Sequence, residues 1–428
     1  MIEALRSYDF EKELKAMSEK KTSQNETTIT ANAITWEHST SDKVLKCRVD
    51  NKNKINVFFI NSFSPESNKN FLNVLINCLK SFDENEYPIV VIHDSDDGGS
   101  GVLAAVFQEM LQLDMRACMF LSFKNDERVH KLIKSSVEAG YFQNPATGKS
   151  FKTVQELMEG SEVDDFGNGV THSRSKPVFD EYSETRAYVD KRKPILKRNR
   201  KPTDIIVFTD SYSFSAGSLF NKGLKEAGAA ILVGYNGYPG SKKEAFDIGQ
   251  APTMVKTNVE ILGKDEYNRL KEKGITYTGI STGESYRASD VENGVKPLVP
   301  REFLVDAPDE HVAIYSAYDD SKYDAFIEAA KGVLEKYIVG CNPDNMGLHM
   351  RSVLCDTKIN KTHMHGGYVC GADGKWSTQC EGYFCDYGYY FDTKTKECVV
   401  DPFSNTDSSS TITISIWALL LVFVFILF

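Results

Sequence analysis

The sequence has no excess of positive charge and no apolar segment at its start. Asp and Glu (60) outnumber Lys and Arg (50), for a formal net charge of −10. This excludes a general nucleic-acid binder, which needs a basic face. The opening residues, MIEALRSYDFEKELKAMSEKK, are charged and contain no signal-peptide core. With 41% hydrophobic residues, the composition is otherwise typical of a globular protein.

Cysteine is sparse until the C-terminal region, where six of the nine cysteines crowd together. Such an even set in a short Gly-, Asp- and Tyr-rich stretch predicts a disulfide-stapled module, because so small a segment buries too little apolar surface to fold alone. No CxxC pair is present, which weakens the alternative of a zinc site using His363 and His365. We therefore expect no metal and no cofactor, and the pairing stays open among Cys341, Cys355, Cys370, Cys380, Cys385 and Cys398.

Long hydrophobic runs are lacking except at the very end, ITISIWALLLVFVFILF, residues 412–428. The run is a little short for a spanning helix and no charge follows it. With the polar stretch before it, it matches a glycosylphosphatidylinositol signal attached at Ser404, Asn405 or Asp407. A C-terminal membrane helix is the alternative. Both predict a membrane-anchored protein at the cell surface or in a secretory or vacuolar lumen.

Secretion conflicts with the charged start of the chain. Either further residues precede Met1 in the native protein, or the tail inserts after synthesis and the cysteines stay reduced in the cytosol. We favour the first interpretation. The sequons at Asn25 and Asn360 are usable only in a secreted chain.

From Lys54 onward the hydrophobic pattern alternates between strands and helices, which is typical of an α/β fold with a mostly parallel, covered sheet. Strands are expected at 54–63, 87–94, 116–123, 204–210 and 229–235, and helices at 68–82, 102–113, 216–228 and 324–339. The basic run at 191–201 is expected to be a solvated or disordered surface loop, with a nuclear address or an anionic-lipid patch as the alternatives. We predict a lead-in at 1–53, an α/β domain at 54–338, the cysteine module at 339–400, a polar linker at 401–411 and the hydrophobic tail at 412–428.

Ser215 stands at the corner between a predicted strand and a predicted helix, within TDSYSFSAGSLF. A hydroxyl there lies at the positive end of the helix, where free N–H groups can hold a developing oxyanion. Serine is also a preferred helix N-cap. The position alone therefore leaves two interpretations, a nucleophile or a cap.

Three segments in order resemble the tail-specific, or C-terminal processing, serine peptidase family: IVVIHDSDDGGSG, SFSAGSLFNKGLKEAGAAILVGYNGYPG and ASDVENGVKPLVPREFLVDAP. The resemblance covers about residues 54–308. It implies a crotonase-like core of repeated β-β-α units and hydrolysis of protein or peptide substrates through an acyl-enzyme. It also implies Ser215 as nucleophile, Glu292 as orienting acid, and an oxyanion hole from the N–H of Ala216 and of Gly98 or Gly99.

The general base is where the sequence departs from this family. A neutral serine hydroxyl needs a base within hydrogen-bond reach. Bacterial members use a lysine at the position that Gly240 occupies here, and the nearby candidates are Lys242 and Lys243. We take Lys242 as the expected base.

The tricorn and chlamydial branches of the family use a histidine on the early strand instead. This sequence has Phe59 and Asn61 there. The nearest histidines are His93, which we expect to be structural, and His38, a looser candidate. The general base is thus the residue of the predicted site that the family resemblance supports least.

The sequence predicts a membrane-anchored serine endopeptidase, with two alternatives. One is a catalytically silent relative that binds a ligand or protein, because the same domain type occurs in a retinoid carrier without proteolysis and a fold does not guarantee chemistry. The other is a surface protein whose aromatic-rich cysteine module recognises a partner.

Overall fold

The computed structural model describes residues 34–111, 119–180, 200 and 202–400, apart from gaps at 238–241, 251–254, 258–263, 275–278, 288–289, 292–298, 342–351, 355–358, 360, 386–388 and 393. Contacts divide the chain into residues Met1–Thr35 and Trp36–Phe428, and every element below belongs to the second unit. The hydrophobic tail, the three candidate attachment sites predicted before it, both sequons and Glu292 lie outside the described residues.

A seven-stranded sheet with the order β1-β2-β3-β4-β10-β11-β15 forms the centre of this unit. The neighbours from β3 to β15 pair in parallel, as the alternation of strands and helices predicted. The first two strands pair antiparallel, and both precede residue 54, in the predicted lead-in. The strands are β1 His38–Ser39, β2 Leu45–Asp50, β3 Ile55–Ile60, β4 Ile89–His93, β10 Ile205–Thr209, β11 Ile231–Gly234 and β15 Glu310–His311.

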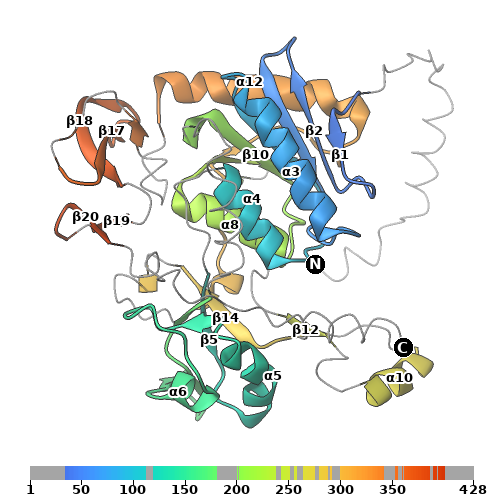
Figure 1. Cartoon of the computed structure of the whole chain (residues 1–428), viewed down its shortest axis with the longest axis vertical. Helices are drawn as coiled ribbons and strands as arrows, with labels where there is room; N and C mark the ends of the chain where they lie inside the picture. Colours follow the sequence, from blue (N-terminus) through green and yellow to red (C-terminus); the bar gives the residue numbers. More distant parts are fainter. Residues whose placement is uncertain are drawn as a thin grey trace, which may run out of the picture. The chain divides into compact units, whose positions relative to one another are not determined.

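Helices cover both faces of this sheet (Figure 1). Because successive strand residues point to opposite faces, Phe58 of β3 packs against Phe82 and Phe107, from the helices on one face. On the other face Phe208 of β10 packs edge-on against Phe326. The first face carries α3 Asn68–Asp83, α4 Gly101–Leu111 and α8 Ala216–Ala227, and the second carries α12 Tyr323–Val339.

The strand predicted at 116–123 is present, but it does not join the parallel main sheet as the alternating pattern suggested. It is β5 Met119–Phe123, which pairs antiparallel with β14 Gly283–Tyr286 and β9 Val178–Asp180, and β9 also pairs with β6 Phe142–Gln143. An apolar run indicates a buried strand but not its partner, and β14 comes from far along the chain. The helices α5 Glu127–Glu138 and α6 Val154–Met158 follow β5. The crotonase-like repeat stays a prediction within this mixed α/β fold.

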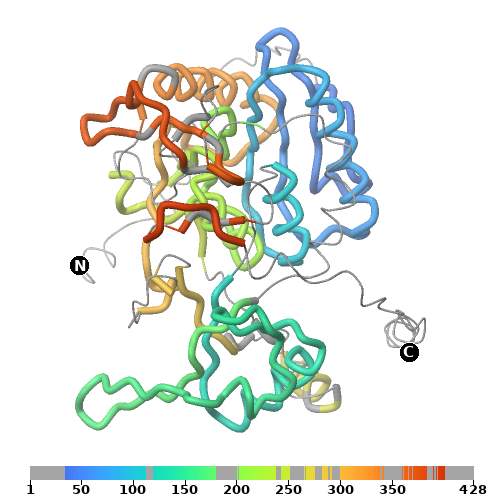
Figure 2. Tube along the Cα trace, turned by 60° about the vertical axis from the view of Figure 1, so that its left-hand side comes forward, coloured from blue at the N-terminus to red at the C-terminus, as the bar shows by residue number. Residues whose placement is uncertain are grey.

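Smaller elements complete the described chain. The trace in Figure 2 shows β7 Glu162–Asp165 and β8 Thr171–Arg174 as an extended hairpin. Arg200, from the predicted solvated basic run, is instead buried and donates to the carbonyls of Phe82 and Asn85. The remaining elements are β12 Val255–Thr257, β13 Gly279–Ser281, α10 Lys264–Glu272, η2 Pro202–Asp204, η3 Lys243–Ala245, η4 Arg301–Phe303 and η5 Asp320–Lys322.

Disulfides occur at both ends of the described unit. Cys341 is bonded to Cys370, and Cys380 and Cys398 are also disulfide-bonded, so these four thiols are not zinc ligands. The module strands are β16 Ser352–Leu354, β17 Met364–Cys370, β18 Trp376–Cys385, β19 Tyr389–Asp392 and β20 Glu397–Val400. Among the described residues no group of three His, Cys, Asp or Glu side chains is arranged to hold a metal.

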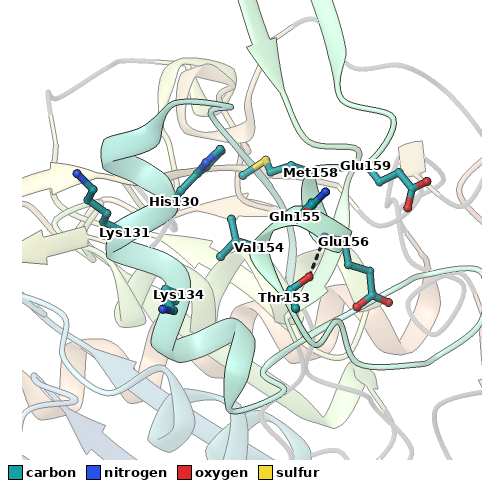
Figure 3. Close-up of a pocket in the computed structure, with 9 residues that line it drawn as sticks. All are labelled: His130, Lys131, Lys134, Thr153, Val154, Gln155, Glu156, Met158 and Glu159. Atoms are coloured by element: carbon teal, nitrogen blue, oxygen red, sulfur yellow. Dashed lines mark hydrogen bonds between the residues drawn. The ribbon is translucent and has the colours of Figure 1, made fainter.

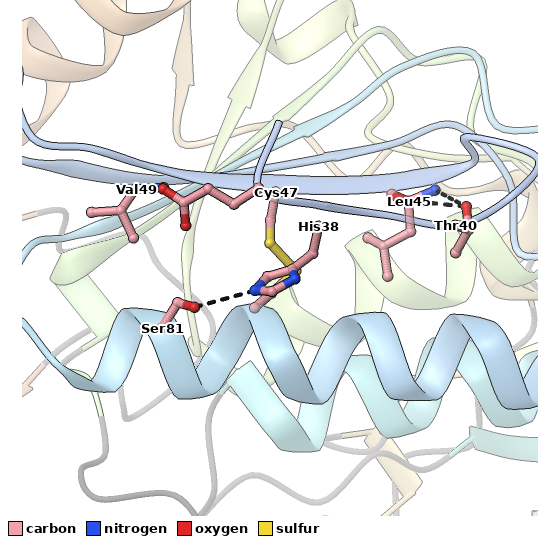
Figure 4. Close-up of a disulfide and its surroundings, with 8 residues drawn as sticks. His38, Thr40, Leu45, Cys47, Val49 and Ser81 are labelled. Atoms are coloured by element: carbon pink, nitrogen blue, oxygen red, sulfur yellow. Dashed lines mark hydrogen bonds between the residues drawn. A yellow bond between two sulfur atoms is a disulfide. The ribbon is translucent and has the colours of Figure 1, made fainter. Parts of the chain in front are cut away.

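A further disulfide, which the sequence did not reveal, joins two of the isolated cysteines. Cys47 of β2 is bonded to Cys78 of α3, so the helix is covalently held to the sheet (Figure 4).

None of the described helices combines the length and the apolar character that crossing a bilayer requires.

Candidate active site

Ser215 immediately precedes α8 and has a conformation that is unusual for a residue with a side chain. Its φ of 49° and ψ of −110° are sparsely populated, at a cost of about 1 to 3 kcal/mol that the surrounding structure must sustain. Its side chain makes no capping hydrogen bond to the helix. The cap interpretation therefore does not account for this serine, and the residue is partly exposed.

Backbone hydrogen bonds hold the corner on two sides. The N–H of Ser215 donates to the carbonyl of Gln250 (3.1 Å), whose own N–H donates to the carbonyl of Ser213 (2.7 Å). On the other side the N–H of Phe214 donates to the carbonyl of Asp96 (3.0 Å). The strained corner is thus fixed between residue 250 and the loop that follows β4.

That loop contains the paired glycines, and it lies directly against Ser215. A Cβ on Gly98 would sit 2.9 Å from the Ser215 Cβ, and one on Gly99 would sit 2.3 Å from the backbone of Phe63. Both glycines also have positive φ, 97° and 132°. Only residues without a Cβ fit here, and the structure brings the predicted glycine loop and the predicted nucleophile together.

The N–H groups of Gly98, Gly99 and Ala216 differ in whether they already donate a hydrogen bond within the protein. The N–H of Gly98 donates to Asp96 Oδ1 (2.8 Å). Within the described part of the chain, the N–H groups of Gly99 and Ala216 donate to no protein acceptor. Of the two glycines that the sequence offered, Gly99 therefore has the N–H available for a substrate oxygen, and its role stays a prediction.

No base faces Ser215 among the residues described. Lys242 is exposed at the start of η3, and Lys243 Nζ donates to the carbonyl of Asp309 (3.0 Å). No described side-chain nitrogen forms a hydrogen bond with the Ser215 hydroxyl. The predicted orienting acid, Glu292, lies outside the described residues.

The two histidine candidates are engaged elsewhere. His38 in β1 pairs with Ser81 Oγ of α3 (3.3 Å), beside the Cys47–Cys78 disulfide (Figure 4). His93, at the end of β4, is fully buried, with Nε2 2.7 Å from Asp96 Oδ2 and Nδ1 2.9 Å from Asn221 Oδ1. Both nitrogens of His93 are therefore occupied, as expected for a structural histidine.

Three further carboxylates and amides around the site were missed from the sequence. Asp96 and Asn221 form hydrogen bonds with His93. Asp210, which follows β10, accepts hydrogen bonds from the N–H and Oγ of Ser95 (both 3.0 Å). Burial, with the nearby charge of Asp94, raises the pKa of Asp210 above its usual value. Their place in the sequence could have identified two of them, because Asp96 and Asp210 each follow a strand, and the two strands end at the same edge of a parallel sheet.

A buried charge cluster joins α8 to Asp247 and to the segment 301–306. Lys222 Nζ lies 3.0 Å from Asp247 Oδ1 and 3.1 Å from Asp306 Oδ2. Arg301 bonds Asp306 (3.2 Å) and Glu226 (2.6 Å). Burial disfavours the Asp306 carboxylate, but the positive charges of Arg301, Lys222 and Arg287 outweigh it and hold its pKa well below the usual range.

A separate pocket lies between α5 and α6 and contains none of the predicted site residues. In Figure 3 His130 of α5 points toward Met158 of α6, and Thr153 caps α6 by accepting from the N–H of Glu156 (3.1 Å). His130 Nε2 is engaged with Asn125 Oδ1 (3.0 Å). No nucleophile with a neighbouring base appears among the residues that line this pocket.

Similar proteins were found among solved structures only. No protein-family model and no curated protein matches the sequence. A protein from Parabacteroides merdae with a peptidase assignment is 15% identical, covers 70% of this chain and 66% of its own, and has a TM-score of 0.36. Mature CPAF is 14% identical over 70% of this chain and 53% of its own, with a TM-score of 0.35.

A third similar structure is a photosystem II D1 C-terminal processing protease, 6% identical over 60% of this chain and 42% of its own, with a TM-score of 0.29. These structures belong to the class of peptidase that the sequence resemblance named, and the matched region spans two-thirds of their length or less. At such identities and TM-scores the likeness carries no argument about activity, so the proposal below rests on the residues of this chain.

Proposed function

We propose that the chain is a serine-type endopeptidase with Ser215 as its nucleophile. The observation that carries this proposal is the strained, uncapped Ser215 at the start of α8, packed against the paired glycines. Strain of this kind persists where surrounding structure enforces it, and it clusters at active sites. A helix cap would need neither the positive φ nor the adjoining glycine loop.

The proposed reaction begins when Ser215 Oγ attacks a substrate carbonyl and its proton passes to a base. The N–H groups of Gly99 and Ala216 would receive the negative charge that develops on the carbonyl oxygen, and removing one such donor typically costs about 10² to 10³ in kcat. The base gives this proton to the nitrogen of the cleaved peptide bond, the amine leaves, and water then hydrolyses the acyl-enzyme. Protein or peptide substrates follow from this chemistry.

We assign the base to Lys242 in this proposal, with Glu292 as the orienting acid. Lys243 is the weaker choice because its ammonium already donates to the Asp309 carbonyl. Lys242 is exposed and forms no hydrogen bond with Ser215 among the described residues, so it would have to approach the Ser215 hydroxyl when substrate binds. Catalytic hydrogen bonds that are long in a free enzyme often shorten in the complex with substrate.

The setting proposed for this activity is an oxidising compartment, with the protein held at a membrane by residues 412–428. The Cys47–Cys78 and Cys341–Cys370 disulfides support an oxidising compartment. The membrane anchor rests on the hydrophobic tail of the sequence alone.

Labelling by a fluorophosphonate probe, together with casein turnover, tests the proposal. The wild type should be labelled and turn over casein, and Ser215→Ala should do neither. Ser135→Ala, which changes an exposed serine of α5, is the matched control and should behave as wild type. If the wild type and Ser215→Ala are equally unlabelled and inactive, the peptidase proposal is wrong.

A second function, a silent relative that binds ligand or protein, is favoured by one observation. No described side-chain nitrogen forms a hydrogen bond with the Ser215 hydroxyl. Changing Lys242 and Lys243 together to alanine separates the two functions. Loss of turnover with retained folding supports the peptidase with a lysine base, whereas unlabelled wild type supports the silent relative.

A further inference from the structure

Asp96 joins the two halves of the proposed site through three hydrogen bonds. Its Oδ1 accepts from the N–H of Gly98 (2.8 Å), its Oδ2 lies 2.7 Å from His93 Nε2, and its carbonyl accepts from the N–H of Phe214 (3.0 Å). The side chain is fully buried. One residue therefore holds both the glycine loop and the corner that presents Ser215.

His93 holds Asp96 in turn, and its protonation can be read from its partners. The amide nitrogen of Asn221 donates to Thr209 Oγ1 (3.0 Å) and to the carbonyl of Ile248 (2.8 Å). The Asn221 oxygen must then face His93 Nδ1, which carries a proton to donate. The other ring nitrogen faces a carboxylate, so the imidazolium satisfies both partners.

The surroundings of His93 favour this charged form. Burial alone would lower its pKa, but the hydrogen bond and charge of Asp96 raise the pKa above the usual 6.5, with smaller contributions from Asn221 and from the charge of Asp210. The other described side chains that contact the imidazole carry no charge: Ser213 Oγ lies 3.5 Å from Nδ1, and the rings of Phe63 and Phe220 pack edge-on against it.

We propose that His93 and Asp96 are positioning residues that fix the glycine loop against Ser215 and so set the geometry of the oxyanion hole. This inference rests on the proposed peptidase function, because the loop matters to catalysis only if Ser215 attacks a carbonyl. His93 has no free nitrogen and is not the base. Its contribution passes through Asp96 to Gly98, and from Gly98 to the neighbouring N–H of Gly99.

The pair also gives the site a pH response with a defined sign. The folded-state pKa of His93 is raised, so its stabilising contribution is complete below about 6.5 and is lost as the pH rises through the raised value. Above that value a neutral Nε2 lone pair would face the Asp96 carboxylate. The loop would then be held less firmly, and kcat would fall.

Replacing Asp96 by alanine and by asparagine tests whether the oxygen that accepts from the Gly98 N–H positions the glycine loop. Asp96→Ala removes the acceptor for Gly98, whereas Asp96→Asn keeps an oxygen for Gly98 and offers an N–H to a neutral His93. We expect kcat to fall about 10²-fold in Asp96→Ala with KM within about twofold, as for a small misplacement of catalytic groups. Asp96→Asn should retain most of kcat and should lose the alkaline decline.

Amide hydrogen exchange of residues 97–102 reports on the loop without relying on catalysis. Exchange should accelerate about tenfold in Asp96→Ala, the scale expected for losing one charge-assisted hydrogen bond, and should change little in Asp96→Asn. Asp126→Ala is the matched control, because Asp126 holds a backbone N–H (2.9 Å) at the start of α5, outside the site. It should alter neither kcat nor exchange in the loop.

The outcomes separate this inference from the proposed function. If exchange in the loop is unchanged in Asp96→Ala, the positioning role is wrong whatever the activity. If the loop loosens while Asp96→Ala and Asp96→Asn keep equal kcat, the role in catalysis is wrong although the peptidase stands. An inactive, unlabelled wild type overturns the peptidase and, with it, the catalytic part of this inference. Should Asp96→Ala fail to fold, an alkaline decline retained in Asp96→Asn overturns the proposal and its loss supports it.

Discussion

Gly217 in the first turn of α8 lies against Asp96, so closely that a Cβ on the glycine would sit 2.5 Å from Asp96 Oδ2. The helix that begins at the proposed nucleophile is therefore packed directly on the carboxylate that holds the glycine loop. Because Asp96 is also bonded to His93 and Gly98, it cannot move away from an added methyl group without giving up one of these bonds.

This contact predicts opposite effects for two helical glycines. Gly217→Ala should destabilise the fold by about 1 to 3 kcal/mol, the usual cost of overpacking, and should lower kcat. Gly332→Ala in α12, where nothing lies within 4 Å of an added Cβ, should stabilise it by about 0.5 to 1 kcal/mol through helix propensity. Urea denaturation of both variants measures the difference, and equal shifts would contradict the packing described here.

The buried cluster around Asp306 predicts a loss of stability at acidic pH. The folded-state pKa of Asp306 is depressed, so its contribution is present above the unfolded value of 3.8 and is lost as the pH falls from there towards the folded value. Thermal unfolding midpoints should therefore decline below about pH 4 more steeply in the wild type than in Asp306→Asn. Asp319→Asn, at an exposed helix-start carboxylate, should follow the wild-type slope more closely.

Sequence periodicity predicted most elements of the main sheet because those strands are apolar throughout. The runs at 54–63, 87–94, 204–210 and 229–235 contain β3, β4, β10 and β11, and Gly228 ends α8 in the left-handed conformation expected of a C-cap. The same reasoning could not assign β5 to its sheet, since pairing with β14 depends on contacts between distant segments. Strands β1 and β2, with alternating burial, carry a weaker apolar signal.

The candidate site was predictable in part for a similar reason. Ser215 and the glycine pair are marked by local sequence, and the structure places them in contact. The roles of Asn221 and Gln250 depend on three-dimensional neighbours, so no local pattern identifies them, and Asp96 is marked only by its position after a strand. The assignment of Lys242 and Glu292 stays a prediction.

The Cys47–Cys78 disulfide predicts a stability that depends on redox conditions. The bond joins residues 31 apart, and closing a loop of that size in the unfolded chain stabilises a fold by about 3 to 4 kcal/mol. Changing both cysteines to alanine should lower the free energy of unfolding by roughly this amount. In reducing buffer the wild type should approach the variant if the thiols are accessible on unfolding. Urea denaturation with and without reductant makes the comparison, and an insensitive wild type would contradict a structural role for the bond.

The exposed aromatic residues beside the nucleophile predict a preference for apolar substrates. Tyr212 and Phe214, 70% and 37% exposed, stand on the corner that leads to Ser215, where a bound peptide would cover them. Burying an aromatic side chain against substrate contributes about 1.5 to 3 kcal/mol at most. Tyr212→Ala and Phe214→Ala should therefore raise KM for peptides with apolar residues near the cleaved bond by about tenfold or more, with a smaller change in kcat. Phe303→Ala removes a ring outside this corner that is 78% exposed and should leave KM unchanged. Steady-state kinetics on paired peptides with leucine or serine next to the cleaved bond provide the measurement. Equal KM values for both peptides in the wild type would mean that these rings do not contact substrate.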